Sequence, residues 1–306
     1  MMTPLLPAGM HVFERGWLSS NSVLFTGGEE TLLVDSGYCT HSAQTLLLVE
    51  SVLGTRHLDT LVNTHLHSDH CGGNFALQTC YPAMRTHIPM GQAAQVRDWD
   101  VVALSYLPTG QLCPQFQFNE TLQPGTLIRF GAKPWEIHAA TGHDPHSVMF
   151  FDPVAKILIS ADALWENGFG VVFPELEGAN AFSNVSATLD LIEHLKPSIV
   201  VPGHGRVFTY TPAILRVARQ RLSAFVNNPK RHAHHAAKVL LKFKLLETQQ
   251  QTVETFIQWA TEIGYLRDIY AKFFAEVSIA RWIASLCQEL VHAGVAKIDG
   301  VHIINQ

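Results

Sequence analysis

The stretch from Asn63 to Gly73 places three histidines and one aspartate within six residues. It reads Asn-Thr-His-Leu-His-Ser-Asp-His-Cys-Gly-Gly, and the four groups are His65, His67, Asp69 and His70. An apolar segment precedes the stretch and glycines follow it, which is typical of a loop at the end of a strand. Imidazole nitrogen and carboxylate oxygen are suitable ligands for zinc. Because four such groups would repel one another once protonated, the stretch predicts a metal site rather than a solvated turn.

Short apolar or β-branched segments, bounded by Gly, Pro, Asp or Asn, predict strands through the first two thirds of the chain. Two helices are expected among them, at His41–Leu53 and at Ser183–Leu195 before Pro197. This alternation indicates a mixed α/β (α+β) fold. The expected strands are Ser22–Thr26, Thr31–Val34, Thr60–Asn63, Leu127–Phe130, Trp135–Ala139, Val148–Asp152, Ile157–Ser160 and Ile199–Val201.

The pattern changes to helical periodicity after His204. A hairpin is expected at the end, from Ala296 to Ile304, because Asp299-Gly300 is a typical turn sequence. Several helices followed by a hairpin indicate a mostly helical module with a winged-helix outline. The expected helices are Ala213–Val226, Ala233–Leu246, Val253–Ile263 and Ser278–Ala293.

The charge distribution also divides the chain in two. Residues 206–306 hold 13 basic and 7 acidic residues, a net charge of +6, whereas residues 1–205 hold 8 and 19, a net charge of −11. Segments of opposite charge suggest separate modules. We therefore predict one domain over residues 1–210 and a helical, winged-helix-like domain over residues 211–306.

The composition predicts a globular protein that does not enter a membrane. Hydrophobic residues make up 47% of the chain and charged residues 15%, which excludes an intrinsically disordered chain. No apolar run approaches the roughly 20 residues that a membrane helix needs. The five cysteines are scattered without a Cys-x-x-Cys pair, which argues against a disulfide scaffold and a thiolate zinc finger. Since Met1 to Gly16 lacks the layout of a secretory signal, we expect a cytoplasmic protein.

The motifs resemble those of the metallo-β-lactamase superfamily. The His-x-His-x-Asp-His cluster is similar to the second motif of that family, and Asp35, in Leu-Val-Asp-Ser-Gly, resembles the aspartate of the first. His143, in Thr-Gly-His-Asp-Pro, resembles the third-motif histidine of the glyoxalase II-like branch. Asp162, in Ser-Ala-Asp-Ala-Leu, resembles the bridging aspartate of the fourth motif, and His204, in Pro-Gly-His-Gly, resembles the final histidine. The resemblance covers roughly residues 12–210.

The resemblance implies a four-layer αβ/βα sandwich, to which this chain adds its C-terminal helical module. It also implies two divalent metal ions at one edge of the sandwich, with zinc as the favoured metal and iron or manganese as alternatives. Asp35 is expected to fix the metal loop through hydrogen bonds. The implied ligands are His65, His67 and His143 for one ion, Asp69, His70 and His204 for the other, and Asp162 as a bridge between them.

The implied enzyme is a dinuclear metal-dependent hydrolase. Two adjacent cations lower the pKa of a shared water from about 15.7 towards 7, so that a bridging hydroxide exists at neutral pH. Asp69 would orient this hydroxide in addition to ligating, and Asp69 and Asp162 are the expected catalytic residues. The expected partner is a small-molecule substrate, namely an ester, thioester, lactone or related compound; a homodimer is left open.

Two other functions remain open at this point. Persulfide dioxygenases share the fold but use one iron, and the complete second set of ligands argues against that reaction. A nucleic-acid phosphodiesterase resembling endoribonucleases would use the C-terminal module to bind its substrate. That alternative is weaker, because the helix Ser278–Ala293 carries Arg281 as its only basic residue other than histidine.

Three neighbours of the motifs have two interpretations each. Cys71 could touch the second metal, although packing as a small buried thiol is favoured. His146 is either a substrate-contacting imidazole or a surface histidine. The segment Trp165–Phe173 lines a substrate pocket or belongs to the ordinary core.

Overall fold

The computed structural model describes residues 4–306. Residues 1–3 lie outside the described part. They begin the segment from Met1 to Gly16, which lacks the layout of a secretory signal. A first sheet has six strands in chain order, and it is antiparallel from β1 to β3 and parallel from β3 to β6. Its strands are β1 (Met10–Phe13), β2 (Ser22–Phe25), β3 (Leu32–Val34), β4 (Thr60–Val62), β5 (Arg85–Pro89) and β6 (Glu120–Leu122).

A second sheet also has six strands, in the order β12-β11-β10-β9-β8-β7. In this sheet the pair β10 and β11 is parallel, and the other pairs are antiparallel. Its strands are β7 (Leu127–Phe130), β8 (Lys133–Ala139), β9 (Val148–Asp152), β10 (Ile157–Ala161), β11 (Ile199–Pro202) and β12 (Phe208–Thr209).

The two sheets enclose the main hydrophobic core. Val23 and Phe25 of β2 point into it, together with Phe130, Trp135 and Phe150 of the second sheet. The ring centroids of Phe25 and Phe130 are 4.9 Å apart, and those of Phe130 and Phe150 are 5.0 Å apart. Because successive side chains of a strand alternate between faces, the residue between the first two, Leu24, belongs to a different cluster.

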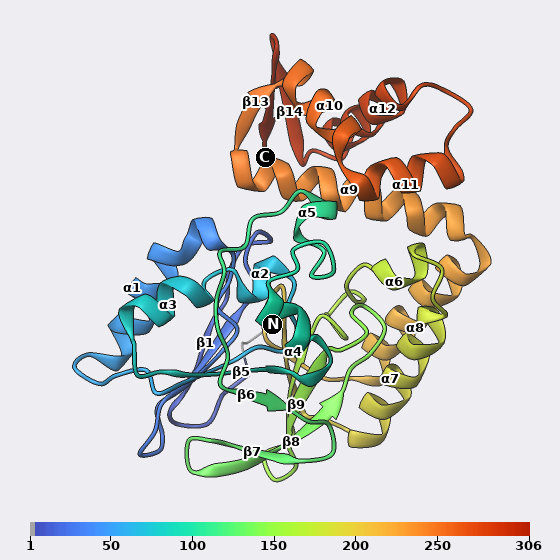
Figure 1. Ribbon diagram of the computed structural model, residues 1–306. Coiled ribbons are helices and arrows are strands. Elements are labelled where there is room, and N and C mark those ends of the chain that lie inside the picture. Colours follow the sequence, from blue (N-terminus) through green and yellow to red (C-terminus); the bar gives the residue numbers. More distant parts are fainter. Residues whose placement is uncertain (1–3) are drawn as a thin grey trace. The chain divides into compact units, whose positions relative to one another are not determined.

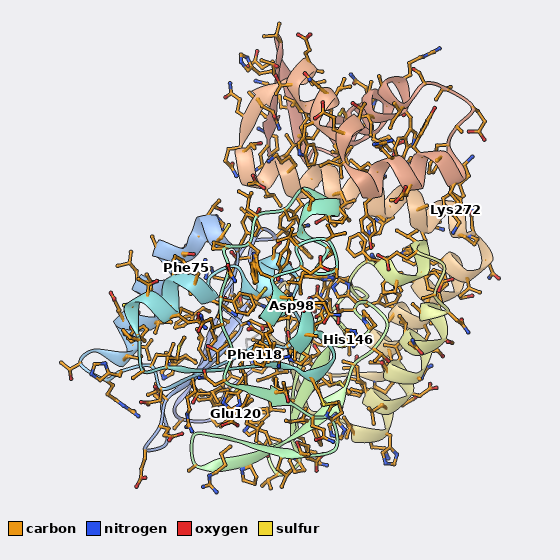
Figure 2. The ribbon with its side chains drawn as sticks, in the orientation of Figure 1. Phe75, Asp98, Phe118, Glu120, His146 and Lys272 are labelled. Atoms are coloured by element: carbon orange, nitrogen blue, oxygen red, sulfur yellow. The ribbon has the colours of Figure 1, made fainter. Side chains whose placement is uncertain are left out.

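That second cluster lies on the outer face of the first sheet. Leu24, Leu33 and Leu61 pack there against Val49 of α1 (Ser42–Leu53) and Leu77 of α3 (Asn74–Cys80). Figure 1 shows α1 and α3 beside the first sheet and α7 (Ala181–Leu195) beside the second. Figure 2 shows Phe75 of α3 on the outer side of this layer, where its side chain is exposed. The layer order is therefore helix, sheet, sheet, helix, which confirms the four-layer αβ/βα sandwich.

The chain forms two compact units. Unit 1 comprises the described residues up to Leu104 together with Leu112–Ser223, and unit 2 comprises Ser105–Gln111 and Ala224–Gln306. The helix α8 (Pro212–Asn227) runs from one unit into the other. The limits of independently folding domains stay a prediction, 1–210 and 211–306. The remaining short helices of unit 1 are η1 (Cys39–His41), α2 (Ser68–Cys71), η2 (Met90–Gln92), α4 (Ala93–Asp98) and α6 (Phe173–Leu176).

Unit 2 is mostly helical and ends in the expected hairpin. The hairpin pairs Asp299 with His302, so its two loop residues are Gly300 and Val301, one position later than the sequence indicates. Three helices begin at capping side chains. Asn228 accepts a hydrogen bond from the backbone of Arg231, Thr252 from that of Thr255, and Ser278 from that of Arg281. The elements are α5 (Tyr106–Thr109), α9 (Pro229–Thr248), β13 (Gln250–Thr252), α10 (Val253–Glu262), α11 (Gly264–Phe273), α12 (Ile279–His292), β14 (Ala296–Asp299) and β15 (His302–Asn305).

Several elements differ from the expectation. The sequence did not predict five short strands and one helix, namely β1, β5, β6, β12, β13 and α11. The strand β13 joins the hairpin in a three-stranded sheet of order β13-β15-β14, so the module is not helical throughout. Across residues 4–306, no helix combines the length and the apolar character that a membrane crossing requires.

Replacing Phe150 by alanine tests the core between the sheets. Phe150 is fully buried among aromatic rings, so Phe150→Ala should lower the free energy of unfolding of unit 1 by about 3–5 kcal/mol. Val154 is 85% exposed, and Val154→Ala should change that free energy by less than about 0.5 kcal/mol. Urea unfolding curves measure both effects, and equal midpoints for the two variants would contradict the core assignment.

Candidate metal centre

The expected site residues follow the ends of strands from both sheets. His65 and His67 lie in the loop after β4, and Asp69 and His70 are on α2, which follows that loop. His143 follows β8, Asp162 follows β10, and His204 follows β11. Because β10 and β11 are parallel neighbours, their carboxyl ends meet at the same edge of the sheet. This topology explains why Asp162 and His204, 42 positions apart, come together.

The structure brings all seven side chains together. Their donor atoms form three groups, and within each group the atoms lie within 4.8 Å of one another. All seven are buried except His67 and Asp69, which are partly exposed. The three groups are His65 with His67 and His143, His65 with His70 and Asp162, and Asp69 with His70 and His204.

The separations of the donor atoms fit metal coordination. A zinc ion with four ligands at about 2.1 Å keeps neighbouring donor atoms about 3.4 Å apart. Two sets of donor groups can be compared with this value. In the first set, which is His65, His67 and His143, His67 Nδ1 lies 2.8 Å from His143 Nε2, and His143 Nε2 lies 3.3 Å from Asp162 Oδ2. In the second set, which is Asp69, His70 and His204, His204 Nε2 lies 3.0 Å from Asp69 Oδ2, and His70 Nε2 lies 3.9 Å from the same oxygen. These separations match the edges of such coordination polyhedra.

Asp162 lies between the two sets. Its Oδ2 faces His143, whereas its Oδ1 is 3.5 Å from His70 Nε2 and 3.9 Å from His204 Nε2. A carboxylate so placed would offer one oxygen to each of the two sets of donor groups if both held a cation. The geometry therefore suits a bridging ligand.

Asp35 fixes the metal loop from behind, as the resemblance implies. Its Oδ2 accepts hydrogen bonds from His70 Nδ1–H and from the hydroxyl of Thr64, both at 2.7 Å, and its Oδ1 accepts one from the Thr64 backbone N–H at 2.8 Å. The Thr64 oxygen also lies 3.2 Å from His65 Nδ1. Since the hydroxyl donates to Asp35, it accepts from His65. Both histidines thus carry a proton on Nδ1 and turn their Nε2 towards the site.

Three buried nitrogens of the donor histidines have no hydrogen-bond partner within residues 4–306. They are His65 Nε2, His70 Nε2 and His204 Nδ1. An unpaired buried polar atom costs about 1–3 kcal/mol, and the two Nε2 atoms belong to the donor groups described above. His143 directs its Nδ1 to the carbonyl of Val171, which leaves its Nε2 for the site. The residues present therefore fit bound cations.

The electrostatics of the site favour the protonation state that binds a cation at His65, His67 and Asp162, and oppose it at His70. Burial, together with neighbouring imidazoles, holds the pKa of His65 well below its usual value and lowers that of His67 to about 4. Burial alone would lower the pKa of His70, but Asp35 and two further carboxylates raise it well above its usual value. Burial would likewise raise the pKa of Asp162, yet the adjacent histidines hold it well below its usual value. A cation can displace the proton of His70 and satisfy the surrounding carboxylates.

Two glycines allow the loops to approach the site closely. A Cβ added at Gly203 would lie 2.2 Å from Asp162 Oδ1 and 3.0 Å from a backbone carbon of Ala161. A Cβ at Gly170 would lie 2.5 Å from His143 Nδ1. Any side chain at these positions would displace a donor group.

Two residues next to the ligands adopt left-handed backbone conformations. Asp35 has a φ of 57° and Ala161 a φ of 46°. Aspartate tolerates this region, whereas an alanine there costs roughly 1–2 kcal/mol. The turn at Ala161 directs the next residue, Asp162, into the site. Such strain is typical of functional loops whose geometry is fixed by their surroundings.

The neighbouring residues can now be assigned. Cys71 lies in none of the donor groups; its sulfur is 3.3 Å from the His67 carbonyl and 3.8 Å from Cys113 Sγ, which supports the packing interpretation. His146 lies in the loop between β8 and β9, labelled in Figure 2, where its ring packs directly against Gly91. Within 165–173, Phe169, Val171 and Val172 are buried core residues.

Two tryptophans reach the site. Trp165 belongs to the segment for which a pocket or a core position was left open, whereas Trp17 was not predicted to lie there. Trp165 Nε1–H donates to Asp162 Oδ1 at 3.1 Å. The indole of Trp17 is stacked on His204, with ring centroids 5.3 Å apart and planes at 12°. Proximity to Asp162 in the chain is a signal for Trp165. No sequence signal identifies Trp17, which is 187 positions from His204.

Comparison with known proteins identifies the family to which this chain is similar. The model of the metallo-beta-lactamase superfamily matches residues 15–204. The chain belongs to this superfamily. It is 23% identical over 215 residues to acyl-coenzyme A thioesterase MBLAC2 of Homo sapiens, covering 64% of this chain and 77% of that protein. It is 22% identical over 254 residues to the Beta-lactamase-like protein 2 homolog of Caenorhabditis elegans, covering 82% and 76% of the two chains.

Solved structures show the same fold. A metallo-beta-lactamase family protein of Thermus thermophilus, TTHA1429, superposes with a TM-score of 0.57 at 18% identity and covers 99% of this chain and 100% of its own. TTHA1623, solved in a di-iron-bound form, superposes with a TM-score of 0.52 at 25% identity and covers 65% of this chain and 94% of its own. The family and the donor groups together identify this member of the superfamily as a metal-dependent hydrolase that binds divalent metal.

Gly203→Ala tests the close approach at the site. The added methyl would collide with Asp162 Oδ1 and with backbone, so the purified variant should retain less than about a tenth of the wild-type metal content. Gly16 has open space around its Cβ position, and Gly16→Ala serves as the matched control. Elemental analysis after dialysis measures both. Wild-type metal content in Gly203→Ala would show that the loops do not need this approach.

Proposed function

We propose that this protein is a dinuclear metal-dependent hydrolase that cleaves a thioester, with an acyl-coenzyme A as the first substrate to test. The complete set of donor groups around Asp162 carries the dinuclear part of the proposal. The names of the curated relatives support the thioester, because the proteins of Homo sapiens, Gallus gallus and Bos taurus are all acyl-coenzyme A thioesterases. We retain esters and lactones as related substrates, since all share an electrophilic carbonyl.

In this proposal the donor groups are divided between two metal sites. Zinc is the proposed metal, because imidazole and carboxylate donors suit it. Cations bound there would supply a water of lowered pKa and would polarise the substrate carbonyl. One site would use His65, His67 and His143, the other Asp69, His70 and His204, with Asp162 as the bridging group.

Asp69 is the carboxylate best placed to orient water. Its side chain is 14% exposed, against 5% for Asp162, so it lies closer to the side from which water and substrate enter. Burial would raise the pKa of Asp69, but the neighbouring His70 and His204 lower it. Asp69 is therefore ionised and accepts hydrogen bonds. We assign to it the role of holding the attacking water towards the carbonyl carbon.

Aromatic side chains surround the donor groups and offer an apolar surface for an acyl chain. The ring of Phe173 lies 5.8 Å from that of His67, and the side chain of Trp17, beside His204, belongs to a residue that is 56% exposed. Apolar walls with a few convergent polar groups are typical of small-molecule sites. This arrangement supports a small acyl substrate.

Elemental analysis combined with a substrate screen tests the proposal. The wild-type protein should contain two divalent ions per chain and hydrolyse acyl-coenzyme A in preference to lactones and phosphodiesters. Removing the metal with a chelator should abolish the activity, and adding zinc should restore it. A single iron per chain with oxygen uptake on a persulfide would favour the dioxygenase, and cleavage of RNA alone would favour the phosphodiesterase.

Asp162→Ala and His67→Ala should each lower kcat/KM by more than about 1000-fold, because metal-ion catalysis contributes several kcal/mol to transition-state stabilisation. The matched control is His138→Ala, since His138 is a partly exposed histidine paired with Glu136 outside the donor groups. That control should retain activity within about twofold. Full turnover by metal-depleted Asp162→Ala would refute the proposed chemistry.

A further inference from the structure

The bridging carboxylate receives a hydrogen bond from an indole. Trp165 Nε1 lies 3.1 Å from Asp162 Oδ1, and an indole nitrogen can only donate. The backbone around Trp165 is itself held in place, because its N–H donates to the Gly168 carbonyl at 2.7 Å and the two residues form an isolated β-bridge. The indole is therefore a fixed donor aimed at a metal-binding group.

This hydrogen bond selects how Asp162 presents its two oxygens. Oδ1 is the oxygen near His70 and His204, whereas Oδ2 is the one near His143. An N–H that donates to a carboxylate makes a charge-assisted hydrogen bond, which is stronger than a neutral one. By occupying one lone pair of Oδ1, the indole leaves the other directed towards the second set of donor groups.

A second indole constrains His204. The ring of Trp17 is stacked on that of His204 at 12°, with centroids 5.3 Å apart, and the edge of Trp165 meets the same imidazole at 79° and 5.5 Å. The two indoles also contact each other edge to face, with centroids 5.3 Å apart. His204 is thus held from two directions by rings that contact each other. Trp17 and Trp165 are hereafter called the indole pair.

We propose that the indole pair is a positioning device for the metal centre: Trp165 holds the Asp162 carboxylate by hydrogen bonding and Trp17 holds the His204 ring by stacking. This inference rests on the proposed function in that it requires the donor groups to bind cations. Groups behind metal ligands typically tune metal affinity about 10- to 100-fold. If the indoles were only packing residues, their replacement would alter stability and leave metal affinity unchanged.

Metal affinity measured by competition with a chelator distinguishes the two roles. Trp165→Phe keeps an aromatic ring and removes the donor, so the apparent Kd for zinc should rise about 10- to 100-fold. Trp17→Ala should raise it about two- to tenfold, as expected for the loss of one aromatic pair. The matched control is Trp99→Phe, since Trp99 packs against Phe116 and belongs to none of the donor groups. That control should bind zinc as the wild type does.

A spectroscopic measurement reports on the hydrogen bond itself. The chain has six tryptophans, so a nitrogen-15 spectrum should show six indole N–H signals, and the signal missing in Trp165→Phe identifies Trp165. This signal should shift when zinc is added and in Asp162→Asn, while the Trp99 signal stays in place. A purely structural role for Trp165 predicts that its signal does not respond to zinc.

The outcomes separate this inference from the proposed function. The positioning role is overturned if Trp165→Phe binds zinc as tightly as the wild type and if the Trp165 indole signal of the wild-type protein does not respond to zinc. A wild-type protein that binds zinc and cleaves no thioester overturns the proposed function, while the ratio of metal affinities still decides the role of the indole pair. A wild-type protein that binds no divalent metal overturns both.

Discussion

Crowding of buried imidazoles and carboxylates is the constraint on which the rest of the structure depends. Burial without compensation would cost several kcal/mol for an ionised group. Here the cost is reduced in two ways, by the hydrogen bonds of Asp35 behind the loop and by the attraction between acidic and basic donor groups. The donor nitrogens that remain unpaired within residues 4–306 are those best satisfied by cations. The unpaired nitrogens that raise the free energy of the metal-free protein are therefore the groups that favour the binding of a cation.

The sandwich supplies this site because strand ends from two sheets meet at one edge. The core between the sheets is built mainly of aromatic and β-branched residues, which hold the strands rigidly. The loops that follow the strands, together with the short helix α2, carry every donor residue. Catalytic side chains on loops over a rigid scaffold are a general solution. Strain at Ala161 is tolerated because Gly170 N–H and Gly203 N–H bond to the carbonyls of Asp162 and Ala161. The backbone of the site is therefore determined by its hydrogen bonds.

The convergence of the seven donor residues could be predicted from the sequence, because each follows a strand and matches a motif that resembles the superfamily's. Long apolar strands such as β9 and β10 were predicted within one residue, since they are buried on every position. The strand β5 was not, because Arg85 and His87 interrupt its apolar pattern. The helix α11 begins at Gly264 without a side-chain cap, so local sequence offers no start signal. Trp17 was missed for another reason: its contact with the site exists only in three dimensions.

The donor groups and their surroundings impose different kinds of specificity. Divalent cations held by imidazoles and carboxylates at these separations would activate water for any electrophilic carbonyl or phosphoryl centre, so the ligand set by itself selects a reaction class. The selection of a substrate depends on what surrounds it, since binding energy from remote contacts is what distinguishes one acyl group from another. For the proposed acyl substrate those contacts would be aromatic, because the rings of Trp17 and Phe173 lie beside His204 and His67. Trp17 joins both functions, because one face of its ring orders His204 while more than half of its surface stays open to solvent. On the proposed function, a residue in that position would couple the arrangement of the metal ligands to the binding of an apolar substrate.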